Sequence, residues 1–82
     1  TNYAFSIFPN PSTGEIIVEY TGDSLCNATF ELYNIYGVKL LEEKINSKQQ
    51  RIILKSINEG VYFYRIINCN AIVNRNKLII TK

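Results

Sequence analysis

The fold is decided by the stretch ATFELYNIYGVK, residues 28–39. Its first half alternates, with Ala28, Phe30 and Leu32 on one face and polar or amphipathic side chains on the other, as in a strand buried on one side. The next four residues, ending at Gly37, form a hairpin turn in which glycine takes a positive φ without steric cost. A strand, a tight turn and a returning strand are therefore expected here.

The rest of the chain repeats this pattern. Thirteen Ile, six Tyr and four Phe supply side chains that suit a pleated, half-buried surface. Strands are expected at residues 5–8, 15–20, 28–35, 38–45, 51–55, 61–67 and 71–81, the last with a possible bulge at 74–76. Ile57 is expected to return from its turn toward the core. Short strands with turns and no helix between them predict an all-β fold, a seven-stranded antiparallel Ig-like β-sandwich with Greek-key topology.

Length and composition exclude several classes of function. The 82 residues allow one domain, residues 1–82. The absence of His excludes a Ser-His or Cys-His nucleophile, and two Cys without His cannot close a zinc site. The net charge of +2 comes from singly spread cations, more typical of solvated strand faces than of a nucleic-acid surface. The sequence thus predicts no enzyme, no cofactor, no metal and no nucleic-acid partner.

The ends of the sequence suggest a part of a larger protein. No apolar run approaches the roughly 20 residues of a membrane span, so no transmembrane segment is expected. The first residue is Thr1 rather than Met, which indicates a segment excised from a longer product. The first and last strands are expected to be sheet edges, blunted by Pro9, Pro11, Lys77 and Lys82.

Four segments in this order carry a family resemblance: Phe8–Gly14 (FPNPSTG), Leu32–Lys39 (LYNIYGVK), Ile57–Ile66 (INEGVYFYRI) and Lys77–Lys82 (KLIITK). Together the segments resemble the type A C-terminal sorting domain of proteins exported by the type IX secretion system (Por secretion system) of Bacteroidota.

The resemblance implies a function that composition cannot show. Such domains are sandwiches that direct an N-terminally attached cargo across the outer membrane and catalyse nothing themselves. The implied partners are the type IX translocon, its outer-membrane shuttle protein and a sortase-like cysteine protease, which commonly removes the domain and anchors the cargo at the cell surface. The implied location is the periplasm, in transit to the outer-membrane surface or the medium. Lys82 is expected to be the C-terminus of the precursor.

The candidate recognition residues are those of the four segments. Each has a structural interpretation, as a turn, a strand start or an edge, and a functional one, as an element read by the export machinery. The final strand, with free backbone groups at an edge, is a candidate for β-augmentation by a partner. The candidate residues are Pro9, Asn10, Pro11, Gly14, Gly37, Gly60, Tyr62, Lys77 and Lys82.

Three questions stay open at this point. Cys26 and Cys69 could pair in an oxidising periplasm, although sequence cannot place them close together, and two separate thiols are favoured. A carbohydrate-binding or adhesive module is the alternative function, with an aromatic platform drawn from Tyr3, Tyr20, Tyr33 and Tyr36. A passive Ig-like spacer is the third reading.

Overall fold

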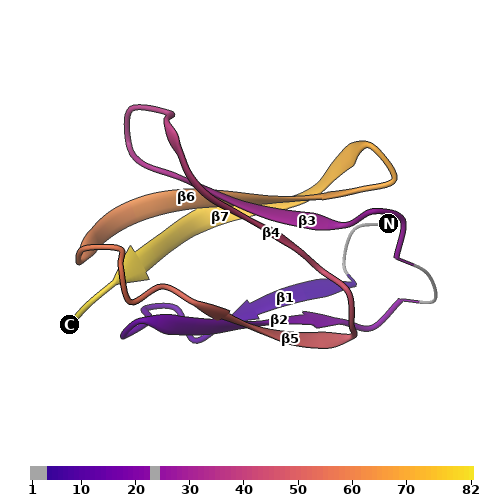
Figure 1. Ribbon diagram of the computed structural model, residues 1–82, viewed down its shortest axis with the longest axis horizontal. Coiled ribbons are helices and arrows are strands. Elements are labelled where there is room, and N and C mark those ends of the chain that lie inside the picture. The colour runs from indigo at the N-terminus through magenta and orange to yellow at the C-terminus, as the bar shows by residue number, and fades with distance from the viewer. Residues whose placement is uncertain (1–3, 23–24) are drawn as a thin grey trace.

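The computed structural model describes residues 4–22 and 25–82, a part of the chain that contains seven strands (Figure 1). The strands are β1 (Phe5–Phe8), β2 (Glu15–Tyr20), β3 (Thr29–Tyr33), β4 (Lys39–Lys44), β5 (Gln49–Ile53), β6 (Gly60–Asn68) and β7 (Ala71–Ile80). In these residues no helix is long and apolar enough to cross a membrane. Thr1 and Tyr3, named above, lie outside the described residues.

Two antiparallel sheets form the layers of a sandwich. One sheet has the order β1-β2-β5 and the other has the order β4-β3-β6-β7. The chain crosses between the layers after β2, after β4 and after β5, so that β6 returns to lie beside β3 (Figure 1). The predicted all-β Ig-like sandwich is confirmed.

The core comes from the inward-facing positions of both sheets. Phe30, Leu32 and Ile66 are completely buried in one sheet, opposite Ile16 and Val18 in the other. This is the alternation that the sequence predicts, and it follows from the period-2 geometry of a strand. Ile57 is partly buried and packs against this core, as expected.

Five strands differ from the expected boundaries by one or two residues. β3 ends at Tyr33 rather than at residue 35, β4 is shorter and β6 longer by one residue at each end, and β7 ends at Ile80. β5 begins at Gln49 rather than Arg51, because its two glutamines pair with Val18 and Glu19 of β2. It ends at Ile53, since the next N–H turns to the Gly14 carbonyl at 2.7 Å. β7 is one continuous strand without a break at residues 74–76. The irregularity lies at Val73, just before this segment. Ile66 of β6 pairs with Asn74 and Ile67 pairs with Ile72, so the register shifts between Ile66 and Ile67.

Antiparallel strands place alternate connections at the same end of the sandwich. The connections 9–14, 34–38 and 54–59 therefore share one end with Lys82, and we call this the motif end (Figure 1). The other end, the cysteine end, carries Cys26, the 45–48 connection and the turn between β6 and β7. The four segments of the family resemblance contribute all their turns to the motif end.

Candidate recognition surface

A short segment after β1, residues 10–12, binds the outer edge of β7, and we call this segment the clip. The Asn10 side chain accepts a hydrogen bond from the Ile79 N–H at 3.0 Å and donates one to the Lys77 carbonyl at 2.8 Å. The Ser12 N–H donates to the Ile79 carbonyl at 2.8 Å, and the Thr81 N–H donates to the Ser12 carbonyl at 2.7 Å. The clip thus occupies outward backbone groups along the last residues of β7.

This contact corrects the expectation of a free final strand. β7 is an edge of its sheet, but a parallel bridge between Ser12 and Ile80 covers its C-terminal part. Pro9 and Pro11, both after cis peptide bonds, flank Asn10 in this segment. A partner could add a strand beside residues 77–81 only by displacing the clip, so β-augmentation there is not available in this conformation.

Ser12 anchors the clip inside the protein. Its side chain is fully buried, and its hydroxyl donates to the Glu15 carbonyl at 2.7 Å. The Ser12 hydroxyl oxygen also accepts hydrogen bonds from the N–H groups of Gly14 at 3.2 Å and Glu15 at 3.1 Å. Ser12 is absent from the candidates chosen by sequence, although a serine two residues before a glycine in a turn is a known signal for side chain–backbone bonding.

The chain end closes onto the turn between β5 and β6. The Lys82 ammonium donates to the Lys55 carbonyl at 2.9 Å and also to the Ile57 carbonyl. In the same turn the Tyr62 hydroxyl donates to the Asn58 carbonyl at 2.7 Å. Gly60 has φ of +153°, and a Cβ there would meet the Tyr62 ring at 3.6 Å.

The hairpin between β3 and β4 completes this end. Gly37 has φ of +82°, as expected for its turn. The Asn34 side chain accepts hydrogen bonds from the N–H groups of Tyr36 at 2.9 Å and Val38 at 3.0 Å, which fixes the turn. Tyr36 is 83% exposed and Ile35 is 61% exposed at its tip.

Large apolar side chains are exposed mainly at and near the motif end. Among the described residues, such side chains lie in its connections, in the first residues of β4 and β6, or in the last residues of β1 and β5, and only Ile72 belongs to the cysteine end. The motif-end group is Phe8, Ile35, Tyr36, Val38, Leu40, Ile53, Val61 and Phe63. This uneven distribution makes the motif end the candidate recognition surface.

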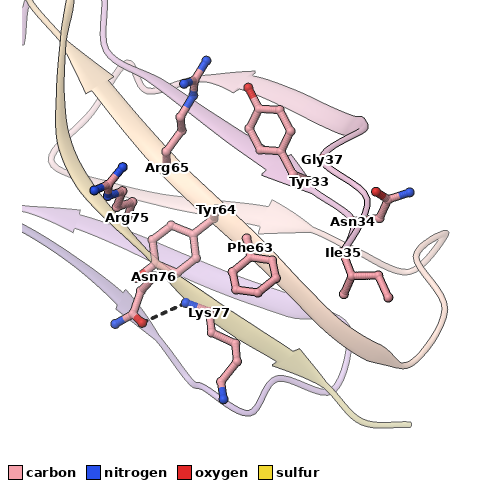
Figure 2. A pocket seen from close by; sticks show the side chains of 10 residues that line it. All are labelled: Tyr33, Asn34, Ile35, Gly37, Phe63, Tyr64, Arg65, Arg75, Asn76 and Lys77. Atoms are coloured by element: carbon pink, nitrogen blue, oxygen red, sulfur yellow. Dashed lines mark hydrogen bonds between the residues drawn. The ribbon is translucent and has the colours of Figure 1, made fainter.

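A groove of about 630 Å³ lies on the outer face of the four-stranded sheet, next to this apolar group (Figure 2). Its lining comes from the β3–β4 hairpin, from β6 and from β7, and includes Phe63. Arg65 and Arg75 are direct neighbours on adjacent strands, and Lys77 lies two residues further along β7. These cations, which are separate in the sequence, suit carboxylate or phosphate groups of a partner.

Glu31 organises the charges beside the groove. It faces outward but is only 6% exposed, and it accepts hydrogen bonds from Arg65 at 2.6 Å, Tyr33 at 2.7 Å and Lys39 at 3.1 Å. Burial alone would raise the pKa of Glu31, but these hydrogen bonds outweigh it and lower the pKa to about 2. The Arg65 guanidinium also lies 5.3 Å from the centre of the Tyr33 ring. The alternation pattern predicted the direction of Glu31 but not its burial.

The remaining candidates occupy different surroundings. Tyr20 is buried and packs on Phe5, with ring centroids 4.6 Å apart. Tyr33 contacts Glu31 on the outer face, while Tyr36 projects from the hairpin tip. The described tyrosines therefore do not share the platform that a sugar-binding module would use. The described residues also contain no group of three or more potential metal ligands.

These features define a small all-β module whose exposed large apolar side chains lie mainly at one end. A family model described as a secretion system C-terminal sorting domain matches residues 6–81. The chain therefore belongs to the family of type IX secretion C-terminal sorting domains, as its four segments indicate, and this is not a family of enzymes. A comparison with curated proteins finds no match.

Proposed function

We propose that this domain directs an attached N-terminal cargo through the outer membrane and that the export machinery recognises it at the motif end. The exposed apolar side chains at this end are the observation that carries the proposal. Family membership supports the sorting role, since these domains serve as type IX secretion signals. The recognition surface would consist of the β3–β4 hairpin, the neighbouring groove and the clip with the end of β7.

The rigidity of the motif end favours binding. Hydrogen bonds already fix Asn10 against β7 and Lys82 against the 55–57 turn, so little conformational entropy is lost when a partner binds. Arg75 and Lys77 add positive charge at the groove, which suits acidic residues of the translocon or its shuttle protein. Phe5 begins β1 at the opposite end, so the cargo would be attached away from the recognition surface (Figure 1).

The later steps are proposed from the family resemblance. After transit through the periplasm, a sortase-like cysteine protease would remove the domain and join the cargo to a surface glycolipid. In this proposal residues 1–82 form one C-terminal signal domain whose last residue, Lys82, ends the precursor. The domain would act as an address and would leave the chemistry to the protease.

The test is an export assay in a Bacteroidota host with a working type IX system. Residues 1–82 are fused to a fluorescent protein that is delivered to the periplasm, and a parallel fusion lacks residues 77–82. The full fusion is expected at the cell surface or in the medium, and the shortened fusion in the periplasm. A folded full fusion that stays in the periplasm would contradict the sorting function and favour the binding-module alternative.

Two matched substitutions locate the recognition surface. Ile35→Asp places a charge on the exposed hairpin tip, and Ile72→Asp places the same charge on an exposed isoleucine at the cysteine end. Because neither side chain belongs to the core, both variants should fold, which a thermal melt of each purified domain checks. Export should fall about tenfold or more for Ile35→Asp, the effect of losing one central apolar contact. Export of Ile72→Asp should be unchanged; equal export of both variants would refute recognition at the motif end.

A further inference from the structure

The two cysteines are neighbours at the cysteine end, although the sequence left their pairing open and favoured two separate thiols. The Cys69 N–H donates a hydrogen bond to the Cys26 carbonyl at 2.9 Å, so their backbones are in direct contact. The neighbouring Cys26 side chain raises the pKa of the Cys69 thiol. Both residues are exposed and carry free thiols in this structure, so an oxidant in solution can reach them.

Local backbone geometry holds this arrangement in place. Asn68 and Ala71 pair across the β6–β7 hairpin, which leaves Cys69 and Asn70 as a two-residue turn. Both turn residues have positive φ, +53° and +62°, as the twist of a tight hairpin requires. The Asn68 side chain accepts a hydrogen bond from the Cys26 N–H at 2.7 Å, which fixes the facing segment.

We propose that Cys26 and Cys69 form an intramolecular disulfide when the domain is in an oxidising compartment. One thiolate attacks a sulfur of an oxidised low-molecular-weight or protein disulfide, which releases one thiolate of the oxidant. The second cysteine thiolate then displaces the oxidant's other sulfur from the mixed disulfide. The domain loses two electrons and two protons, and the oxidant is reduced to two thiols.

The disulfide would close a long loop between two segments whose backbones are already in contact. The cysteines are 43 positions apart in the sequence, and the loop between them includes β3, β4, β5 and β6. Closing a loop of this length restricts the unfolded chain and raises the melting temperature of a small domain by about 10–25 °C. The bond would stabilise the end of the sandwich at which β1 begins. This inference does not depend on the sorting function.

The test uses residues 1–82 treated with glutathione disulfide at neutral pH and compared with the protein kept in dithiothreitol. Oxidation should reduce the free thiols from two to none, lower the monomer mass by about 2 Da and raise the melting temperature by about 10–25 °C. The double variant Cys26→Ser/Cys69→Ser should fold and melt at the same temperature in both conditions. Its melt separates the effect of the bond from the effect of the reagents.

Two results would overturn the disulfide. One is a folded protein whose two thiols both remain titratable, or carry only glutathione adducts, after oxidation. The other is a wild-type product that consists of disulfide-linked dimers, as the single variants Cys26→Ser and Cys69→Ser can form. A monomer that gains the bond but does not melt at a higher temperature would overturn the stabilising role alone.

Discussion

The two ends of the sandwich are built by different means. At the motif end, segments far apart in sequence are joined by side chains: Asn10 bonds to β7 and Lys82 bonds to the 55–57 turn. At the cysteine end, a tight hairpin turn meets the segment before β3 through the Cys26–Cys69 contact. The motif end also exposes most of the large apolar side chains of the described residues.

Under the proposed function, this difference would separate recognition at one end from closure of the fold at the other. An end that must bind a partner needs exposed apolar groups, and these groups lower solubility and add nothing to the core. The motif end therefore has to be held in place by other contacts, and the hydrogen bonds of the clip and of Lys82 provide them. The cysteine end has no comparable apolar surface among its described residues and can be closed by two side chains. The predictions below test this division, beginning with the largest effect.

The largest difference is expected between two isoleucines of β7. Ile80 is 1% exposed under the clip, whereas Ile72 is 46% exposed at the cysteine end. Ile80→Ala removes buried methyl groups and leaves a cavity, so the free energy of unfolding should fall by about 3 kcal/mol. Ile72→Ala should cost less than about 1 kcal/mol. Urea denaturation of both variants measures this, and similar losses would mean that Ile80 contributes no more to the core than the exposed Ile72.

A smaller effect is expected from the acid beside the groove. The pKa of Glu31 is about 2 in the folded domain and near 4.5 when unfolded, so between these values the unfolded chain binds more protons. The stability from Glu31 is therefore complete above about pH 4.5 and is lost as the pH falls toward 2. The shift corresponds to about 3 kcal/mol at neutral pH, and solvent screening of the partly exposed Lys39 and Arg65 reduces this to about 2–3 kcal/mol.

The substitution Glu31→Gln should remove this stability at pH 7 and flatten the decline of the melting temperature between about pH 4.5 and 2. The exposed Glu43→Gln on β4 is the matched control and should change the free energy of unfolding by less than about 0.5 kcal/mol. Thermal melts across this pH range provide the measurement. An unchanged acid profile in Glu31→Gln would show that Glu31 has no stabilising role in the folded domain.

The sequence predicted what depends on local periodicity. Alternation at Ile16, Val18 and Phe30 is enough to assign strands and their buried face, and Gly37 is enough to assign its turn. The order of the strands could also have placed the four family segments at one end of the sandwich. Their turns are alternate connections, and alternate connections of antiparallel strands lie at the same end.

The sequence could not predict contacts that depend on register between distant strands. Asn10 reaches backbone groups 67 and 69 residues away, and no local pattern marks that pairing. Glu31 sits at an outward position, so its burial depends on Arg65 and Lys39 arriving from other strands. The nearness of the cysteines depends likewise on how β6 pairs with β3.

The smallest difference in the free energy of unfolding is expected between two serines whose hydroxyls both donate to backbone carbonyls. Ser12 is fully buried in the clip, whereas Ser47 is exposed at the cysteine end and donates to the Gln49 carbonyl at 2.9 Å. Ser12→Ala leaves buried backbone N–H groups without their acceptor, so it should lower the free energy of unfolding by about 1–2 kcal/mol. Ser47→Ala should cost less than about 0.5 kcal/mol, since water replaces the lost bond.

In the export assay, Ser12→Ala also shows whether the clip only stabilises the motif end or itself contacts the export machinery. If the clip only supports the motif end, Ser12→Ala should reduce export no more than its loss of stability explains, and a lower growth temperature should restore export. Ile35→Asp should reduce export at unchanged stability, because its side chain lies at the exposed hairpin tip. A Ser12→Ala domain that melts like the wild type yet is not exported would instead place the clip itself in contact with the export machinery.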